Sequence, residues 1–320
     1  MKPKVLITRK LPEGIIKKIS EVCTVELWDE EETPIPQEEL AEKMINVDGV
    51  LCLLTENIDK KLIDGSPKLK VISNMAVGYN NIDIEAAKKK GIIVTNTPDV
   101  LTETTADLTF ALLMATSRRL IEASTYLRNG EWKTWSPLQL AGQDIYNSTL
   151  GIIGMGRIGE AIAKRALGFN MNIVYYNRSR KLDMEQSLNV QYSELDDLLK
   201  ESDFIVVMTP YTPQTTNLIS EREFKLMKKS AILINTSRGG IVDEKALYDA
   251  LVNKEIYAAG LDVFETEPIN LNNRLLTLPN LVALPHIGSS SINTRYKMAN
   301  LAAENLIAGV LGNRPKHVVS

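Results

Sequence analysis

The feature that most constrains this chain is a glycine turn between two apolar runs, in residues 149–179. An apolar run at 150–153 leads into the motif Gly154-Met155-Gly156-Arg157-Ile158-Gly159, a helical pattern follows, and a second apolar run lies at 173–176. A strand, a glycine turn, a helix and a strand within about thirty residues form the context in which this turn binds a dinucleotide. The first glycine permits the tight turn, the second lets backbone approach a pyrophosphate, and the third lets the helix lie close to the strand. The helix N-terminus then offers N–H groups to the phosphates.

Two other protein classes, FAD-binding proteins and methyltransferases, use similar turns, and tight packing of a helix on a strand can by itself require glycines. FAD fingerprints usually open a chain, whereas this one lies near the middle with a domain's length before it. The flanking strands and helix favour dinucleotide binding, and the motif's position at mid-chain disfavours FAD.

Length and composition predict a two-domain globular protein. The chain has 320 residues, 44% of them hydrophobic and 24% charged, which is ordinary for such proteins. The net charge of −3 and the lack of a basic stripe argue against a nucleic-acid partner. Cys23 and Cys52 are too few for a disulfide framework and are expected to be buried thiols in a reducing compartment. With no apolar run long enough for a membrane span and no signal-peptide pattern, we expect a cytoplasmic protein with no membrane partner.

The first hundred residues alternate short strands with short helices, which predicts a parallel sheet covered by helices on both faces. The run at 49–54 is continuously apolar, as expected for a strand buried on both faces. Strands are predicted at 5–8, 25–28, 49–54, 70–75 and 92–95, and helices at 12–19, 36–44, 59–63 and 83–90.

Pro98-Asp99 marks a break, after which a helix that is apolar nearly all round begins at Leu101. This helix should be buried and is a candidate for the crossing between domains. A second helix reaches Arg128, and the irregular segment 129–148 follows with two tryptophans, Trp132 and Trp135. A loop of this length is usually functional or lies at an interface. The alternative is that the two indoles fill a gap beneath the loop.

Polar residues follow the predicted strands of the second domain, at 150–153, 173–176, 203–209, 231–235, 259–263 and 281–283; a last helix is predicted at 291–309. In parallel sheets of this kind, ligands bind beyond the carboxyl ends of the strands. An arginine, a carboxylate and a histidine therefore converge on one edge. The residues after the strands are Asn177, Arg178 and Ser179; Thr209 and Pro210; Asn235, Thr236, Ser237 and Arg238; Glu265, Thr266, Glu267 and Pro268; and Pro285, His286, Ile287 and Gly288.

Only two histidines occur, His286 and His317, and His317 lies in a polar tail where a solvated role is expected. His286 lies at the ligand-binding edge of the sheet, although a lone histidine is often structural. Histidine exchanges protons near neutral pH, a carboxylate beside it favours the imidazolium, and an arginine presents a fork that fits a substrate carboxylate. Reduction of a 2-oxo acid needs these three groups beside a hydride donor. No metal site is expected, because histidines are few and no cysteine cluster has ligand spacing.

Five further segments carry a family resemblance: NMAVGYNNID at 74–83, TPDVLTETTADLTFALL at 97–113, NTSRGGIVDEKAL at 235–247, GLDVFETEP at 260–268 and LPHIGSS at 284–290. With the glycine motif, they resemble the D-isomer-specific 2-hydroxyacid dehydrogenases over essentially the whole chain. Residues 50–59 and NGEWKTWSP at 129–137 are similar to the glyoxylate/hydroxypyruvate reductases, which include 2-ketogluconate reductases. The resemblance implies an α/β fold of two doubly wound parallel sheets. A flavodoxin-like substrate domain would comprise 1–100 and 288–320, and a Rossmann domain would comprise 101–287.

The resemblance also implies catalytic roles. Arg238 would hold the substrate carboxylate and polarise the keto oxygen, Glu267 would pair with the histidine, and His286 would be the general acid. Glu265 matches the less constrained acid of that motif and is not expected to be catalytic.

Residues of the first domain would contribute to substrate binding. Val77 and Gly78 match a backbone N–H turn that meets the substrate carboxylate, although an ordinary tight turn is the alternative. Leu54 would line the pocket, and Trp135 would reach a partner subunit's pocket, with Trp132 as the alternative for that role.

For the cofactor, the resemblance implies that Asp262 and Thr236 lie on the nicotinamide side, and it further implies a homodimer joined through the nucleotide domains and closure of a cleft during turnover. The complete predicted cofactor-binding set is Gly154, Met155, Gly156, Arg157, Ile158, Gly159, Asn177, Arg178, Ser179, Thr209, Pro210, Thr236, Ser237, Asp262 and Gly288.

The end of the second strand of the nucleotide domain predicts which nicotinamide cofactor binds. An NAD-selective fold places Asp or Glu there, but this chain has Asn177 followed by Arg178 and Ser179. A neutral residue does not repel a 2′-phosphate, and the arginine and hydroxyl can bind it, with Arg180 and Lys181 adding positive potential. The sequence favours NADPH over NADH; a basic solvated turn is the alternative.

The sequence thus predicts an NADPH-dependent reductase of small 2-oxo acids such as glyoxylate, hydroxypyruvate or 2-ketogluconate. One alternative is a dinucleotide-sensing protein of the corepressor type, which the intact catalytic residues disfavour. Another is an NAD-dependent dehydrogenase of a phosphorylated 2-hydroxy acid, which would need additional cationic residues near the pocket.

Overall fold

The computed structural model describes residues 2–319 and divides the chain into two compact units. The first unit comprises Met1–Leu101 and Ser290–Ser320, and the second unit comprises Thr102–Ser289. None of the helices among the described residues is both long enough and apolar enough to cross a membrane.

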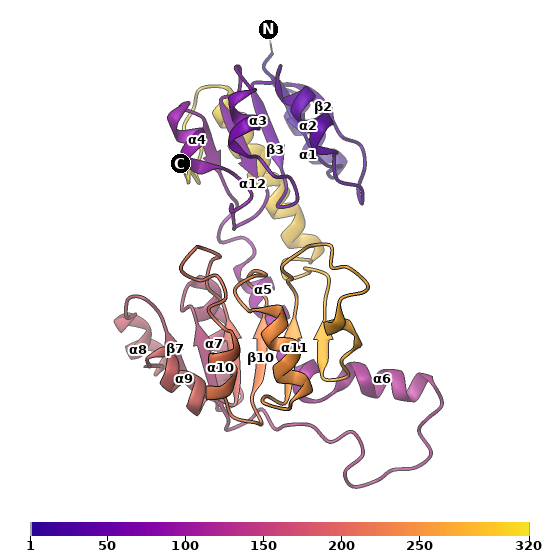
Figure 1. The fold of residues 1–320 in the computed structure, drawn as a ribbon. Helices are drawn as coiled ribbons and strands as arrows, with labels where there is room; N and C mark the ends of the chain where they lie inside the picture. The colour runs from indigo at the N-terminus through magenta and orange to yellow at the C-terminus, as the bar shows by residue number, and fades with distance from the viewer. Residues whose placement is uncertain (1, 320) are drawn as a thin grey trace. The chain divides into compact units, whose positions relative to one another are not determined.

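The first unit contains a five-stranded parallel sheet in the order β2-β1-β3-β4-β5, which is the flavodoxin-like order. Helices cover both faces (Figure 1): α2, α3 and α4 pack over one core, and α12 lies on β3 and β4 beside α1. The C-terminal helix α12 thus returns to the sheet formed by the start of the chain. The elements are β1 (Lys4–Ile7), α1 (Glu13–Ser20), β2 (Thr24–Leu27), α2 (Gln37–Met44), β3 (Gly49–Cys52), α3 (Lys60–Asp64), β4 (Val71–Asn74), α4 (Ile84–Lys89), β5 (Ile93–Thr95) and α12 (Ile292–Val310).

The second unit contains a seven-stranded parallel sheet in the order β12-β11-β10-β9-β6-β7-β8. Counted from β6, this is the Rossmann order 3-2-1-4-5-6 with one further strand at the edge. The strands are β6 (Thr149–Ile153), β7 (Asn172–Tyr176), β8 (Gln191–Tyr192), β9 (Phe204–Val207), β10 (Ile232–Asn235), β11 (Ala258–Leu261) and β12 (Leu281–Ala283). The helices are α5 (Thr102–Ser117), α6 (Leu120–Arg128), α7 (Arg157–Leu167), α8 (Leu182–Leu188), α9 (Leu195–Glu201), α10 (Glu221–Leu226) and α11 (Glu244–Val252), with a 3-10 turn at Arg274–Thr277.

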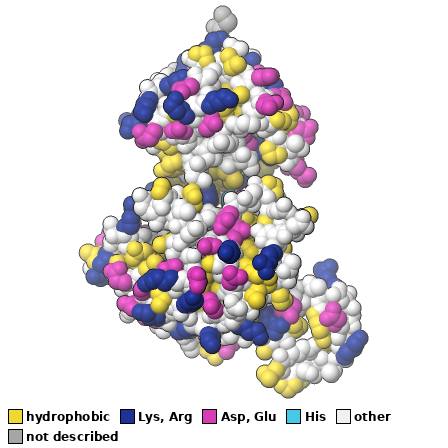
Figure 2. Space-filling model, viewed as in Figure 1, with side chains coloured by type: hydrophobic (Ala, Val, Ile, Leu, Met, Phe, Trp, Pro, Cys, Tyr) yellow, Lys and Arg dark blue, Asp and Glu magenta, His cyan; other side chains and the backbone are white. Residues whose placement is uncertain are grey.

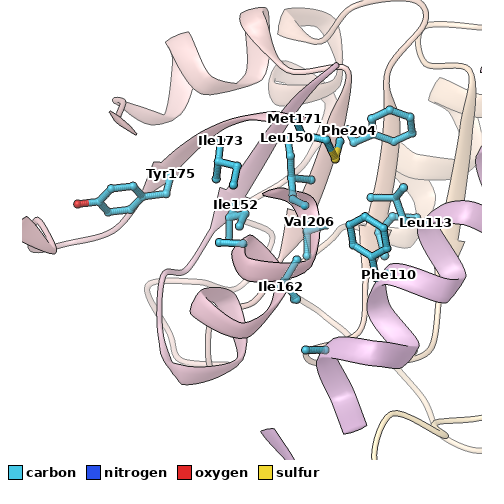
Figure 3. Close-up of a cluster of buried hydrophobic side chains, with 14 of the residues drawn as sticks. Phe110, Leu113, Leu150, Ile152, Ile162, Met171, Ile173, Tyr175, Phe204 and Val206 are labelled. Atoms are coloured by element: carbon cyan, nitrogen blue, oxygen red, sulfur yellow. The ribbon is translucent and has the colours of Figure 1, made fainter. Parts of the chain in front are cut away.

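Alternate residues of each central strand of this sheet enter different cores, because side chains of a strand point to opposite faces. Leu150 and Ile152 of β6 pack with α7 and α5, and Figure 3 shows Ile162 of α7 and Phe110 of α5 beside them. Ile153, from the same strand, packs on the other face with residues of α9, α10 and α11. The two cores hold the carboxyl ends of the strands at one edge, where the predicted site residues lie.

The structure confirms the expected two parallel-sheet domains, and the predicted elements differ from the observed ones by a few residues at their ends. Three short elements were not predicted, namely α8, β8 and α9, because residues 182–201 are polar and each element is too short to show a clear period. Cys23 and Cys52 are free and buried, and burial raises the pKa of both thiols. The helix α5 contributes Phe110, Leu112 and Leu113 to the core, as its apolar pattern predicted.

Trp132 and Trp135 do not fill a gap beneath the loop in the single chain, so that alternative is wrong. Helix α6 and the following loop extend away from the sheet of the second unit (Figure 1). Both indoles lie on this extension, with 57% of Trp132 and 76% of Trp135 exposed. No core of the second unit includes either side chain.

Candidate active site

The glycine turn lies between β6 and α7, beside the end of β9. Gly154 has φ of +107°, and a Cβ there would stand 2.7 Å from the carbonyl of Met208, so the turn requires glycine. A Cβ on Gly159 would stand 2.4 Å from the carbonyl oxygen of Gly154, which shows how closely the helix approaches the strand. A Cβ on Gly156, by contrast, would meet no atom within 4 Å. The backbone at Gly156 therefore borders open space.

This turn has the properties that a pyrophosphate needs. Gly156 is the N-cap of α7 and supplies no side chain to cap the helix, so backbone N–H groups of the first turn can bind an anion. Met155 is fully buried and anchors the turn, whereas Arg157 is exposed and Ile158 half-buried. Opposite, the hydroxyl of Thr209 after β9 is buried and has no hydrogen-bond partner among the described residues, which fits a group that binds a polar ligand. The described residues thus fit a dinucleotide.

The loop after β7 lies at the position of the ribose that carries the 2′-group. The Asn177 side chain donates from Nδ2 to the carbonyl of Ser179 at 3.1 Å and so shapes the loop. Arg178 is exposed, while Arg180 is held by Glu185 (Nε to Oε1, 3.0 Å) and lies over the ring of Tyr192. Among the described residues, no ion pair holds the Arg178 guanidinium, whereas Glu185 holds that of Arg180.

Arg238 lies in a loop that follows β10 and is shaped by Asn235. Asn235 donates from Nδ2 to the Arg238 carbonyl at 2.9 Å, and its Oδ1 accepts from the backbone N–H and the hydroxyl of Ser237. The next residue, Gly239, packs so tightly that a Cβ would stand 1.8 Å from the carbonyl oxygen of Phe264. Glycine at 239 therefore lets the Arg238 loop lie against the loop that carries Glu267.

Glu267 and His286 form a direct pair at the same edge of the sheet. Glu267 Oε2 lies 2.6 Å from His286 Nδ1, and Oε1 accepts from the Phe264 N–H at 3.0 Å. Burial alone would raise the pKa of Glu267, but His286, the Phe264 N–H and the charge of Arg238 together hold it below its ordinary value. Burial lowers the pKa of Arg238, and the Glu267 carboxylate opposes that effect. A cation, a carboxylate and an imidazole thus interact at this edge.

His286 sits in a strained turn that Asp262 fixes. His286 has φ of +54°, which is uncommon for a residue with a side chain. Asp262, fully buried after β11, accepts from the N–H of Ile287 through Oδ1 and from that of Gly288 through Oδ2, both at 2.7 Å. Burial raises the pKa of Asp262 despite these donors. Asp262 therefore holds the turn that presents His286.

Thr236, predicted on the nicotinamide side, is buried and its hydroxyl lies 2.6 Å from that of Thr109 on α5. Pro210 and Ser237 lie at the same carboxyl edge, after β9 and β10. Glu265 points elsewhere, since its Oε1 accepts the N–H of Glu244 at 3.1 Å.

The predicted residues of the first unit also lie beyond carboxyl ends of strands. Leu54 follows β3, and Val77 and Gly78 follow β4. Asn96 donates to the Val77 carbonyl at 2.8 Å and Asn74 to the Gly78 carbonyl at 2.9 Å. Within residues 2–319, no protein acceptor receives the N–H groups of Val77 and Gly78. The turn thus holds its carbonyls and leaves two donors available.

Thr109 and Gly239 had no predicted role, and Asn235 was predicted only to lie at the ligand-binding edge, yet all three shape this site. Thr109 looked like part of an apolar helix, and only the tertiary contact with Thr236 shows its role. Asn235 and Gly239 carried a signal, because a buried asparagine at a strand end and a doubled glycine both indicate a shaped loop. Among the described residues, no cluster of three His, Cys, Asp or Glu side chains could hold a metal ion.

Comparison with known proteins identifies the family. Residues 110–288 match the model of the D-isomer specific 2-hydroxyacid dehydrogenase NAD-binding domain. The glyoxylate reductase of Pyrococcus horikoshii is 52% identical over 324 residues, covering 100% of this chain and 96% of that protein. The glyoxylate reductase of Thermococcus litoralis is 51% identical, covering 100% of this chain and 97% of that protein.

A solved structure with the same fold comes from Sinorhizobium meliloti. It is an NADPH-dependent glyoxylate/hydroxypyruvate reductase in complex with NADP and malonate. Its TM-score is 0.87 at 33% identity, covering 100% of this chain and 97% of that one. The present chain therefore belongs to the D-isomer-specific 2-hydroxyacid dehydrogenases, NAD(P)-dependent oxidoreductases of 2-oxo and 2-hydroxy acids, and within them it groups with the glyoxylate reductases.

Proposed function

We propose that this protein uses NADPH to reduce small 2-oxo acids, namely glyoxylate, hydroxypyruvate or 2-ketogluconate, to D-2-hydroxy acids. The observation that carries the proposal is the pair between His286 Nδ1 and Glu267 Oε2, 2.6 Å apart, at the nucleotide-binding edge of the second sheet. A general acid needs this kind of support, because a partner on one ring nitrogen directs the other toward the substrate.

Each catalytic side chain has a distinct task. When bound, the nicotinamide supplies the hydride that reaches the keto carbon. The Arg238 guanidinium binds the substrate carboxylate and polarises the keto oxygen. His286 Nε2 donates the proton to that oxygen, while Glu267 accepts the Nδ1 hydrogen bond and stabilises the imidazolium before the transfer. The product is a hydroxyl group, and His286 regains a proton from solvent.

The first unit supplies substrate-binding groups in this proposal. The N–H groups of Val77 and Gly78 bind the carboxylate, and Leu54 provides an apolar wall. Support comes from the asparagines that hold the carbonyls of this turn and leave its donors available. Residues 1–101 with 290–320 are thus assigned as the substrate domain, and 102–289 as the nucleotide domain.

The preference for NADPH is supported by the loop after β7. Asn177 carries no charge that would repel a 2′-phosphate, and exposed Arg178 and Ser179 lie next to it. Because Glu185 already holds Arg180, Arg178 is the principal cation for the phosphate. The solved relative from Sinorhizobium meliloti is described as NADPH-dependent, which agrees with this choice.

The protein is further proposed to form a homodimer through the extension of the second unit. Figure 2 shows hydrophobic side chains gathered on this extension, at the lower right of the view. Such a patch on one projecting segment is typical of an interface. A cleft of about 1270 Å³ lies between α6 and the amino-terminal ends of β11 and β12, away from His286, and could receive the extension of a second copy. The exposed residues are Leu120, Ile121, Leu127, Trp132, Trp135, Leu138 and Tyr146.

Light scattering coupled to gel filtration tests the dimer, and a mass of one chain would contradict it. In the dimer, Trp135 is the residue assigned to the partner's substrate pocket. Trp135→Ala should therefore raise KM for the 2-oxo acid more than Trp132→Ala does, and the reverse order would assign the role to Trp132 instead.

The reaction is tested by following oxidation of NADPH and NADH against a panel of 2-oxo acids. Turnover of glyoxylate, hydroxypyruvate or 2-ketogluconate with NADPH is expected. Absence of turnover with every acid and both cofactors would overturn the enzymatic proposal and leave a dinucleotide-sensing role. A strong preference for NADH would overturn the assignment of the loop after β7. Turnover confined to phosphorylated acids would overturn the substrate assignment alone.

A further inference from the structure

In the first unit, a buried ion pair occupies the crevice at the carboxyl ends of the strands, where ligands bind in sheets of this topology. The order β2-β1-β3-β4-β5 reverses direction between β1 and β3, and the crevice at that reversal is the usual ligand site. Here the residues that follow these strands are Thr8 and Arg9 after β1, and Leu53 to Glu56 after β3. Arg9 is 9% exposed and Glu56 only 3%, and they pair at 3.2 Å.

Glu56 receives hydrogen bonds from both loops. Its Oε2 accepts from the Leu53 N–H at 2.6 Å and from the Thr8 hydroxyl at 2.7 Å. Its Oε1 accepts from the Thr55 hydroxyl at 2.6 Å and from Arg9 Nη2 at 3.2 Å. These contacts satisfy both oxygens of the carboxylate, as a buried charge requires. Arg9 also donates from Nη1 to the carbonyl of Glu31 at 3.2 Å.

Stability alone does not account for this arrangement. Apolar residues of similar volume generally stabilise a protein as well as a buried ion pair does, because removing two charges from water is costly. Both charges lie at the carboxyl edge of the sheet, and the core beneath is made of apolar residues such as Leu6, Val50 and Ile72. The pair is therefore best explained by the loops after β1 and β3, which its hydrogen bonds hold together.

Asn81 extends the same network to the neighbouring turn. Its Nδ2 donates to the carbonyls of Leu53 and Glu56, both at 3.0 Å, and its own carbonyl accepts the Ile58 N–H at 2.8 Å. Asn81 lies three residues after Gly78, in the segment that carries the free N–H groups of the substrate turn. One network thus joins the loop bearing Leu54 to the turn bearing Val77 and Gly78.

We propose that Arg9, Glu56 and Asn81 are positioning residues of the substrate domain. Their hydrogen bonds hold the Leu54 loop and the Val77–Gly78 turn in the geometry that receives a 2-oxo acid. The inference rests on the proposed function of these two segments. Because the nucleotide is assigned to the other unit, disturbance of this network should weaken binding of the acid and leave binding of NADPH unchanged.

Asn81→Ala and Asn81→Asp are the main test, because Asn81 is only half-buried and its loss leaves the ion pair intact. Loss of its two hydrogen bonds should raise KM for the 2-oxo acid about tenfold, with kcat within about threefold. KM for NADPH and Tm should stay near those of the wild type. Asn81→Asp should be at least as impaired as Asn81→Ala, because it keeps the shape but replaces the donor with an acceptor facing two carbonyls.

Variants of the ion pair provide a second measurement. Arg9→Lys keeps a cation and should be less impaired in KM for the acid than Arg9→Met. Lys10→Ala is the matched control, because the side chain of the neighbouring Lys10 is exposed and pairs with the exposed Asp29.

An unchanged KM for the acid in folded Asn81 variants of an active enzyme would overturn this inference alone. A joint rise of both KM values together with a lower Tm would also overturn it, since that result indicates a merely structural role. Absence of turnover by the wild type would instead overturn the proposed function.

Discussion

Each of the two sheets has a crevice where its strand order reverses, but the two crevices differ in what occupies them. In the second unit, strand order reverses between β6 and β9, and the loops there are Gly154–Gly159 and Thr209-Pro210. Glycine at 156 leaves open space, and the buried Thr209 hydroxyl has no hydrogen-bond partner within residues 2–319. In the first unit, order reverses between β1 and β3, and the crevice contains the Arg9–Glu56 pair, in which both carboxylate oxygens of Glu56 accept hydrogen bonds from the chain. One crevice is ready for a ligand and the other is filled by the chain.

This difference shows that topology gives the position of a site and that side chains decide its use. Both sheets are parallel and doubly wound, so both offer N–H groups and loops at their carboxyl edges. Glycines and an unpaired hydroxyl suit a large anionic ligand that provides its own polar atoms. The Arg9–Glu56 pair instead occupies its crevice and links loops of the chain through hydrogen bonds. The assigned roles, a nucleotide site and a substrate site, follow from this contrast.

The largest effect should come from removing His286, the proposed proton donor, which lies at the carboxyl edge of the second sheet. His286→Ala should lower kcat by roughly 10²–10⁴, the usual contribution of a positioned general acid. His317→Ala, at the other histidine, is the matched control and should retain wild-type kcat. Steady-state rates with NADPH and a 2-oxo acid measure both. A near-wild-type kcat in His286→Ala would show that another group supplies the proton.

A side chain placed in the open crevice of the second unit should block binding of the cofactor. Gly156→Val places a side chain in space where no protein atom lies within 4 Å, so the protein should fold while KM for NADPH rises by at least about tenfold. Gly159→Val puts its Cβ against the Gly154 carbonyl and should instead lower Tm. Cofactor titrations and thermal melts distinguish the two results. Unchanged cofactor binding in Gly156→Val would contradict the assignment of this crevice.

Two neighbouring arginines at this edge, Arg178 and Arg180, should differ in how much they contribute to binding the 2′-phosphate of NADPH. Arg178→Ala should raise KM for NADPH about tenfold and leave KM for NADH unchanged, because only NADPH carries the phosphate. Arg180→Ala should have a smaller effect, since Glu185 already binds that guanidinium. KM values for both cofactors with each variant are the measurement. Equal changes for the two cofactors would show that Arg178 does not read the phosphate.

The nucleotide crevice of the second unit could be predicted from the sequence, but the Arg9–Glu56 pair in the crevice of the first unit could not. The glycine motif lies within one short segment, and its spacing and flanking apolar runs reveal strand, turn and helix together. Arg238, Glu267 and His286 could also be placed at this edge from the sequence, because each lies in a loop that follows an apolar strand, whereas the choice of Glu267 over Glu265 came from the family motif.

Arg9 and Glu56 are separated by more than forty residues, and each alone resembles an ordinary surface charge. Their pairing depends on β1 and β3 being neighbours, a fact of topology rather than of local pattern. For the same reason, the contacts of Asp262 with the turn after His286 and of Thr109 with Thr236 appear only in the folded chain.

The smallest effect concerns stability at the catalytic edge. The pKa of Glu267 lies below its ordinary value in the folded protein, so its ionised form stabilises the fold. That contribution is fully present above the pKa of an unfolded glutamate, about 4.3, and is lost as pH falls through the lower folded pKa. Glu267→Gln cannot titrate and should melt about 2–4 °C below the wild type at pH 7. The two Tm values should converge below about pH 4; a gap that stayed constant or widened on acidification would show that the carboxylate charge does not stabilise this edge.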